Sequence, residues 1–425
     1  MTCKYLVMSL YHPQVLRGGA QMVAYDLFDA ARADAAYHAT FVGAIDANAF
    51  PRHNRTGAVV SRLGERDDEL LLLTQGFDGF YHLSIDPRRT LALRKLFKET
   101  APDVIHFHHS LLIGLETLQI ARDCCPDATI IYTLHEYLPI CRHNGHLIKV
   151  GSNLTCHTPL PHQCVQCYTD YDVDRYVLRR RMFQTYFENV DAFITPTGYV
   201  RDRFVDWGLP RDKIEVIPNG HRAISPNRPV QPPSRRTNVF GFFGQYVDAK
   251  GIDVLIDAGI RAARQTDSEV RIRIFGGNKA FASAAYVQKI EKLTANAPEN
   301  FFLDEIGDYA REGVIDLMGQ VDWVVVPSIW PEVFALVVSE AWEAKRPVIA
   351  SDTGGLGERI RATGSSLLFQ PGNAEQLSEV MLRCLDNPEL WTSESSSIRG
   401  EVSLDEAWKR HKSLFGKASR ASAPA

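Results

Sequence analysis

Two glutamates separated by seven residues mark the stretch of the chain with the most chemical information. Glu332 and Glu340 follow an apolar run that ends at Pro327-Ser328, and a helix is expected to begin near Phe334. A helix that begins after a buried strand presents unpaired N–H groups and a positive dipole end, which together bind anions. Carboxylates accept hydrogen bonds from hydroxyl groups. The segment therefore predicts a site for a ligand with a diphosphate and sugar hydroxyls, although an isolated pair of glutamates would more simply be surface charges of a helix.

Short apolar runs alternate with amphipathic segments along the whole chain, which is typical of strand–helix–strand units around parallel sheets. The chain has 425 residues, so we expect more than one core. The pattern predicts an α/β protein of two Rossmann-like, doubly wound domains. Residues 45–85 break the pattern and look like an insertion. The predicted strands are Tyr5–Leu10, Thr40–Gly43, Val104–Phe107, Ile130–Leu134, Ala192–Thr195, Ile214–Pro218, Val239–Phe243, Val270–Phe275, Asn300–Leu303, Trp323–Pro327, Pro347–Ala350 and Ser366–Phe369.

A segment rich in proline and polar residues divides the two series of strands. Residues 221–237 suit a linker, because proline cannot continue a helix or a central strand. We expect an N-terminal domain over 1–220 and a second domain over 238–400. For residues 401–425 we expect a helix that packs back on the N-terminal domain, followed by a disordered tail. Ligands of such sheets bind beyond the carboxyl ends of the strands, so we expect the chemistry in the cleft between the domains.

The composition excludes several classes of protein. Apolar residues make up 45% and charged residues 23% of the chain, and the formal net charge of −4 gives no general attraction to nucleic acid. The apolar runs are strand-length and far shorter than a membrane-spanning helix. The N-terminal residues do not have the pattern of a signal peptide. We therefore expect a cytoplasmic protein that does not bind nucleic acid.

The segment around the two glutamates resembles the donor-binding segment of family 4 retaining glycosyltransferases. The resemblance covers Pro327 to Glu358, including Pro347-Val348-Ile349-Ala350-Ser351-Asp352-Thr353-Gly354-Gly355-Leu356-Gly357-Glu358, and it continues at 18–20, 103–108, 133–136, 217–220, 244–251, 275–277 and 368–373. It implies the GT-B architecture, two Rossmann-like domains facing a cleft, with the acceptor side in the first domain and the donor in the second. The implied reaction transfers a sugar from a UDP- or GDP-sugar to a hydroxyl of a glycan or lipid-linked acceptor, with retention, in cell-surface polysaccharide synthesis. Metal would not be required as a cofactor.

The resemblance also implies roles for individual residues. Glu332, Lys250 and His108 would be catalytic, with Lys250 neutralising the leaving diphosphate, which itself helps to deprotonate the acceptor. Glu340 would bind the ribose, and His135 and Glu136 would lie on the acceptor side. The remaining donor-binding residues would be Gly18, Gly19, Gly244, Gln245, Phe334, Ala335, Leu336 and Val337.

One position departs from the family pattern. Many relatives carry arginine where this chain has Gln245, and glutamine brings no charge to a diphosphate. Lys250 and the helix dipole would then carry more of the binding. The departure keeps a second hypothesis open, a catalytically silent GT-B protein that acts as a scaffold. A nicotinamide-dependent oxidoreductase is set aside, because the Gly18-Gly19 turn lacks the G-x-G-x-x-G spacing.

Two further features each leave two interpretations open. Cys141, Cys156, Cys164 and Cys167 match a structural zinc site in number and type, and the simpler interpretation is that they are ordinary thiols of a loop. The basic and aromatic segment 175–187 could contact an anionic membrane surface. Its simpler interpretation is a solvated face above a packed one.

Overall fold

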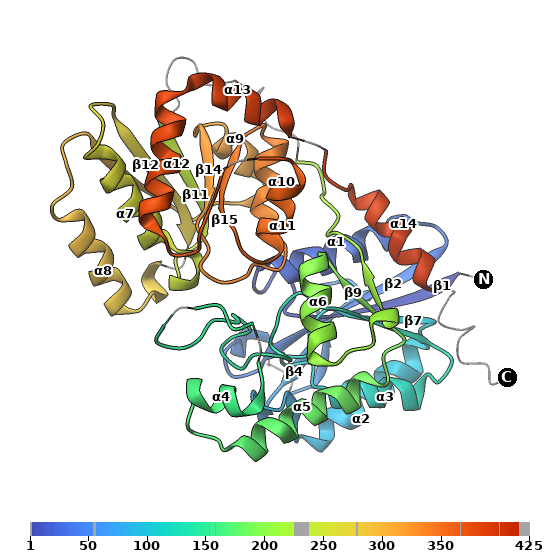
Figure 1. The fold of residues 1–425 in the computed structure, drawn as a ribbon. Coiled ribbons are helices and arrows are strands. Elements are labelled where there is room, and N and C mark those ends of the chain that lie inside the picture. Colours follow the sequence, from blue (N-terminus) through green and yellow to red (C-terminus); the bar gives the residue numbers. More distant parts are fainter. Residues whose placement is uncertain are drawn as a thin grey trace. The chain divides into compact units, whose positions relative to one another are not determined.

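The computed structural model describes residues 2–53, 57–152, 154–157, 159–224, 238–277, 279–365, 367–398 and 400–415. The chain forms two compact units, each with its own sheet (Figure 1). Unit 1 comprises residues 1–150, 156–222 and 402–425, and unit 2 comprises 151–155 and 223–401. Most of the predicted linker, 225–237, and the predicted tail, 416–425, lie outside the described residues.

Unit 1 is built on an eight-stranded sheet of order β10-β9-β8-β7-β1-β2-β4-β3. All neighbours are parallel except β3 and β4, and Tyr5 of the central β1 pairs with both Ala39 and Val104. The strands are β1 (Cys3–Leu10), β2 (Tyr37–Asp46), β3 (Val60–Arg62), β4 (Glu69–Thr74), β7 (Val104–Phe107), β8 (Thr129–Thr133), β9 (Ala192–Thr195) and β10 (Ile214–Val216), with a separate hairpin of β5 (Phe77–Asp78) and β6 (Leu83–Ser84).

The helices of unit 1 are α1 (Gly19–Ala33), α2 (Pro87–Thr100), α3 (Glu116–Cys124), α4 (Pro161–Cys167), α5 (Val173–Phe187), α6 (Gly198–Trp207) and α14 (Leu404–Phe415). Helix α2 begins at Pro87, because the Asp86 side chain accepts a hydrogen bond from the Arg88 N–H and proline suits the first turn of a helix. Helix α14 comes from the far end of the sequence and packs against α1.

Unit 2 is a six-stranded parallel sheet of order β13-β12-β11-β14-β15-β16. Figure 1 shows α7, α8 and α12 on one face of this sheet and α9, α10 and α11 on the other. The strands are β11 (Val239–Gln245), β12 (Val270–Gly277), β13 (Phe301–Gly307), β14 (Trp323–Val326), β15 (Val348–Ser351) and β16 (Leu368–Phe369). The helices are α7 (Ile252–Ala263), α8 (Ala284–Thr294), α9 (Val314–Met318), α10 (Leu336–Glu343), α11 (Gly354–Ala362), α12 (Ala374–Asp386) and α13 (Pro388–Ser397).

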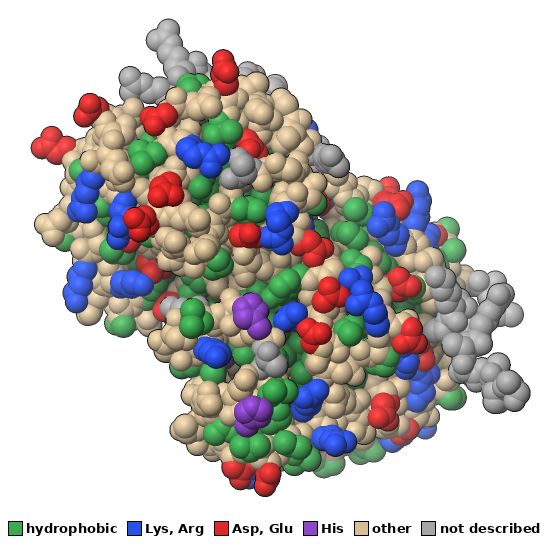
Figure 2. Space-filling model, viewed as in Figure 1, with side chains coloured by type: hydrophobic (Ala, Val, Ile, Leu, Met, Phe, Trp, Pro, Cys, Tyr) green, Lys and Arg blue, Asp and Glu red, His purple; other side chains and the backbone are tan. Residues whose placement is uncertain are grey.

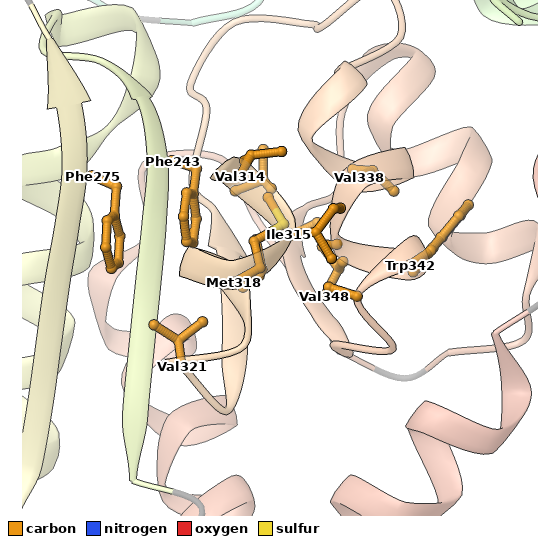
Figure 3. Packing of buried hydrophobic residues seen from close by; sticks show 14 of the residues in the cluster. Phe243, Phe275, Val314, Ile315, Met318, Val321, Val338, Trp342 and Val348 are labelled. Carbon is orange, nitrogen blue, oxygen red and sulfur yellow. The ribbon is translucent and has the colours of Figure 1, made fainter. Parts of the chain in front are cut away.

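An apolar core fixes α9 and α10 on their face of the unit 2 sheet (Figure 3). Phe243 and Phe275, on neighbouring strands, stack with ring centroids 4.4 Å apart. Met318 and Val338 pack into the same cluster and are fully buried. Because α10 is held on this core, its first residues stay beside the end of β14.

On the face shown in Figure 2, acidic and basic side chains are interspersed. Among the described residues, no helix has the length and apolar character to cross a bilayer.

Candidate active site

The predicted donor-site residues of unit 2 lie where the strand order reverses. Strands β11 and β14 are hydrogen-bonded neighbours, and the chain continues from them toward opposite edges of the sheet. Ligands of doubly wound sheets bind beyond the carboxyl ends of strands at such a point. Gly244 and Gln245 end β11, and Pro327 follows β14, so both motifs lie at this edge.

An ion pair joins the two motifs. The Lys250 Nζ atom lies 2.6 Å from Glu332 Oε1. The same oxygen accepts hydrogen bonds from the Ser328 hydroxyl at 2.6 Å and the Trp330 indole at 3.0 Å. Glu332 is only 4% exposed. Three donors on one buried oxygen hold this carboxylate in a single orientation, which is the preorganisation that a binding or catalytic site needs.

Close backbone approaches bring the lysine to the glutamate. Gly251 has φ +70°, and a Cβ there would lie 2.0 Å from the Pro327 carbonyl oxygen. The Ile329 N–H donates to the Ala249 carbonyl at 3.0 Å. On the other side, the Gly355 N–H donates to the Glu332 carbonyl at 2.7 Å. Gly251 and Gly355, from two of the recognised motifs, therefore contact the segment that carries Glu332 from both sides.

Helix α10 begins at Leu336, two residues later than the sequence pattern indicates. Ala335 precedes it in a left-handed conformation, with φ 61° and ψ 82°. The first N–H groups of a helix have no acceptor inside the helix, so the turn from Phe334 to Val337 can present amides to an anion. Glu340 lies one turn further on. Burial, and then the charge of Glu340, raise the pKa of Tyr309, which places this carboxylate near the tyrosine.

Gln245 is exposed at the end of β11. Its side chain is therefore accessible to a ligand at the edge where Lys250 lies. The contribution of Gln245 to diphosphate binding stays a prediction.

The predicted histidines of unit 1 form a pair in which His108 is buried and His135 is half-buried. His108 directly follows β7, and its backbone N–H donates to the Met8 carbonyl of β1 at 2.8 Å. His108 Nδ1 lies 2.9 Å from His135 Nε2, and the rings are stacked at 15°. Burial lowers the pKa of both rings, that of His135 to about 3. Both are therefore neutral at neutral pH, and one donates to the other.

Glu136 has an unusual protonation state for a carboxyl group. Burial raises its pKa to about 8, against smaller opposite effects from the Leu138 N–H and Arg179. His109 Nε2 lies 3.5 Å from Glu136 Oε1. The Leu111 N–H donates to His109 Nδ1, so the proton of this ring is on Nε2 and faces Glu136. Glu136 is thus a neutral acid at neutral pH and can donate a hydrogen bond.

The Gly18-Gly19 turn lies in unit 1 at the start of α1, after β1. Gly18 has φ −161°, an extended conformation open to any residue. A Cβ there would lie 2.4 Å from the Oε1 atom of Gln21, which is the end of a flexible side chain and can move aside, so the geometry does not require glycine at this position.

The predicted site residues therefore form two groups, one in each unit. Unit 1 holds Gly18, Gly19, His108, His135 and Glu136, and unit 2 holds Gly244, Gln245, Lys250, Glu332, Phe334 to Val337 and Glu340. Sequence reasoning assigned no role to Ser328, Trp330 or Arg359. Ser328 and Trp330 lie inside the recognised motif, and their hydroxyl and indole donors close to Glu332 in sequence could have indicated that they bind it.

Among the described residues, the four predicted cysteines do not form an assembled metal centre. None of the eight cysteines, all within the described residues, is in a disulfide. Burial raises the pKa of Cys141 to about 11 and that of Cys164 to about 12. As the side chains stand, the described residues contain no group of three or more His, Cys, Asp or Glu that could hold a metal ion. The zinc hypothesis stays a prediction.

The basic helix is less basic on its surface than the sequence indicates. Arg179 of α5 is buried and donates to the carbonyls of Phe80, Pro139 and Leu138 at 2.8, 2.8 and 2.5 Å. Arg180 donates to the Trp207 carbonyl at 2.6 Å. Two of the three consecutive arginines thus serve internal contacts, which reduces the surface expected to face a membrane.

Solved structures with the same fold cover nearly the whole chain. A sucrose-phosphate synthase of Thermosynechococcus elongatus superposes with a TM-score of 0.68 at 17% identity, over 99% of this chain and 100% of that one. The Anabaena protein HepE in complex with UDP gives a TM-score of 0.64 at 17% identity, over 97% and 99%. At this identity the comparison establishes the fold, which is GT-B.

Curated relatives match parts of the sequence. An uncharacterized glycosyltransferase of Methanocaldococcus jannaschii is 27% identical over 242 residues, which are 57% of this chain and 63% of that protein. A D-inositol 3-phosphate glycosyltransferase of Nocardia farcinica is 28% identical over 193 residues, 42% of each chain. The alignments thus span less than two thirds of these relatives.

Two family models match successive parts of the chain. The model for Glycosyltransferase Family 4 matches residues 17–222, and that for Glycosyl transferases group 1 matches residues 224–396. The chain therefore belongs to glycosyltransferase family 4, as the motifs around Glu332 predict.

Proposed function

We propose that this glycosyltransferase uses a nucleotide-sugar donor, a UDP- or GDP-sugar, and transfers the sugar with retention to a hydroxyl group. The observation that carries the proposal is the Lys250–Glu332 ion pair at the β11/β14 edge, next to the N-terminus of α10. An ammonium group and helix amides together suit a diphosphate. The printed description of HepE, a protein with the same fold, names UDP and UDP-glucose as its ligands.

In the proposed reaction, binding energy acts mainly on the leaving diphosphate. Lys250, held by Glu332, neutralises the negative charge that develops as the glycosidic bond breaks. The amides of the turn from Phe334 to Val337 bind the phosphate oxygens, and Glu340 accepts hydrogen bonds from the ribose. The leaving diphosphate accepts the proton of the acceptor hydroxyl on the same face of the sugar, so no carboxylate is required as a nucleophile.

The acceptor is proposed to be a glycan or a lipid-linked sugar in surface polysaccharide synthesis. His108, His135 and the neutral Glu136 would bind sugar hydroxyls at the end of β7 and β8. This acceptor proposal depends on the family resemblance and on the clustering of polar groups at this edge of unit 1.

Donor hydrolysis in the absence of acceptor tests the proposal. Wild-type protein is incubated with UDP-, GDP- and ADP-sugars, after a thermal-shift panel has identified the ligand that raises the melting temperature. We expect Glu332→Gln and Lys250→Ala to reduce hydrolysis by roughly 100-fold or more. Arg261→Ala is the control, since it removes the Arg261–Asp257 pair on α7 of the same unit. Absence of any nucleotide binding at millimolar concentration would refute the donor proposal and favour the scaffold hypothesis that Gln245 keeps open.

Metal independence is tested in the same assay. Lys250 and the backbone amides supply the positive charge that Mg²⁺ supplies in other enzymes. We expect donor hydrolysis to keep its rate after treatment with EDTA. A loss that added Mg²⁺ or Mn²⁺ restores would contradict the proposal.

A further inference from the structure

Arg359 lies behind the turn that precedes α10, on the neighbouring helix α11. Its side chain is 9% exposed, and its guanidinium carbon lies 3.8 Å from the centroid of the Phe334 ring. Nη1 donates to the carbonyls of Phe334 and Ala335 at 2.7 and 2.9 Å. Nη2 donates to the Ser339 hydroxyl at 2.9 Å and to Glu401 at 2.5 Å. One guanidinium thus contacts the turn, the first part of α10 and the end of unit 2.

These hydrogen bonds determine where the amides of the turn point. In a planar trans peptide, the carbonyl and the following N–H point in opposite directions. Because Arg359 holds the carbonyls of Phe334 and Ala335, the N–H groups of Ala335 and Leu336 point away from it. The turn also contains Ala335 at φ 61°, a conformation that is strained for a residue with a Cβ and persists only where its surroundings enforce it.

The buried Arg359 guanidinium is not explained by a gain in the free energy of unfolding. Burial lowers the pKa of Arg359, and the charge of Glu401 opposes that effect. Glu401 is itself largely buried, with 13% of its side chain exposed. A buried ion pair contributes little net stability compared with apolar residues of the same size. Arginine instead contributes a planar guanidinium group with several N–H donors, which can donate hydrogen bonds to two carbonyls at once.

We propose that Arg359 is a positioning residue for the donor site: it orients the amides of Ala335 and Leu336 toward the diphosphate, and Glu401 holds it in place. The inference rests on the proposed function, because it assumes that the turn binds the diphosphate of a nucleotide-sugar. In the proposed arrangement, Arg359 does not contact the donor. It acts through the backbone of the turn.

The test compares ligands with and without a diphosphate. Dissociation constants for the nucleoside diphosphate and for the corresponding nucleoside are measured by calorimetry with wild-type protein and with Arg359→Lys. Lysine keeps the positive charge but lacks the planar set of N–H donors that the guanidinium group provides. We expect the diphosphate to bind about tenfold more weakly to the variant, whereas binding of the nucleoside stays within about twofold. General damage to unit 2 would weaken both ligands alike.

Arg346→Lys is the matched control. Arg346 is also buried in unit 2, donates to the carbonyls of Met318 and Gly319 at 3.1 Å each, and stacks on Trp391. We expect this variant to lower the melting temperature without changing diphosphate affinity. Glu401→Gln is the milder second variant of the proposed pair, with an expected weakening of about threefold for the diphosphate alone.

Equal diphosphate binding by wild-type and Arg359→Lys protein would overturn the positioning role and leave the donor proposal intact. An equal loss in Arg346→Lys would also overturn it. If wild-type protein binds no nucleotide at all, the proposed function fails first, and the inference fails with it.

Discussion

At the scale of single residues, the site depends on side chains whose partners come from distant parts of the sequence. The motifs predicted Lys250 and Glu332 for one site, and the structure places them 2.6 Å apart. The motifs did not predict that Ser328 and Trp330 would bind the same oxygen. Nor did they indicate Arg359, because a single arginine in a helix is normally a surface residue. Such contacts depend on rotamers and burial, which spacing does not encode.

Glu136 gives a prediction about pH. Its carboxyl group is protonated in the folded state up to about pH 8 and ionises near its ordinary value in the unfolded chain. Between these values the folded state binds more protons, so Glu136 lowers the free energy of unfolding as pH rises, by at most about 1.4 kcal/mol per pH unit. Glu136→Gln keeps the shape and removes the titration.

We therefore expect Glu136→Gln to stabilise the protein relative to wild type at pH 8, and to have little effect near pH 5. Urea unfolding at both pH values measures the difference. An equal effect at the two pH values would show that Glu136 ionises normally in the folded state.

At the scale of elements, the strand pattern predicted the parallel core well, and the twelve predicted strands have counterparts in the structure. The interpretation of residues 45–85 as an insertion was wrong in part. Strand β4 pairs with β2 inside this range, and β3 adds an antiparallel edge. Loops rich in glycine and polar residues flank β4, so the apolar run of β4 was not recognised as a strand of the main sheet. Its burial depends on pairing with β2, which a local pattern does not report.

Gly251 supplies a prediction at this scale. It has φ +70°, and a Cβ there would meet the Pro327 carbonyl oxygen at 2.0 Å. Gly364 has a similar φ of +79° but open space around it. Gly364→Ala should cost only the left-handed strain, about 1 kcal/mol.

Gly251→Ala should cost several times more, because backbone must move as well. It should also weaken donor binding, since the movement separates Lys250 from Glu332. Thermal unfolding and nucleotide calorimetry on both variants test this expectation. Similar losses of stability in the two variants would show that the turn at Gly251 relaxes easily.

At the scale of the whole molecule, the first strands and the last described helix, α14, pack together in unit 1. Trp408 of α14 packs on Tyr5 and Tyr37 with ring centroids 5.4 and 5.1 Å apart. Its indole N–H donates to Asp34 at 3.2 Å, and Lys412 pairs with the same carboxylate. Helix α14 is therefore part of the packing around the first sheet, although unit 2 separates the two in sequence.

Trp408→Ala should lower the free energy of unfolding of unit 1 by about 3–5 kcal/mol. Hydrogen exchange of the amides in β1 and β2 should accelerate, while β14 keeps its protection. Trp391→Ala is the matched variant in unit 2, where the indole donates to the Asp322 carbonyl at 2.8 Å. Trp391→Ala should accelerate exchange in β14 and leave β1 and β2 protected. Acceleration of both sheets by either variant would mean that the units unfold together.

Hydrogen exchange of unit 2 with and without a saturating nucleotide-sugar tests the proposed donor site at the level of single amides. The proposed diphosphate site is the turn before α10, so the amides of Ala335, Leu336 and Val337 should become strongly protected when the ligand binds. Lys250→Ala should reduce that protection at equal ligand concentration. Binding that leaves these three amides unchanged, or that protects a different edge of the sheet, would contradict the assignment of the donor site.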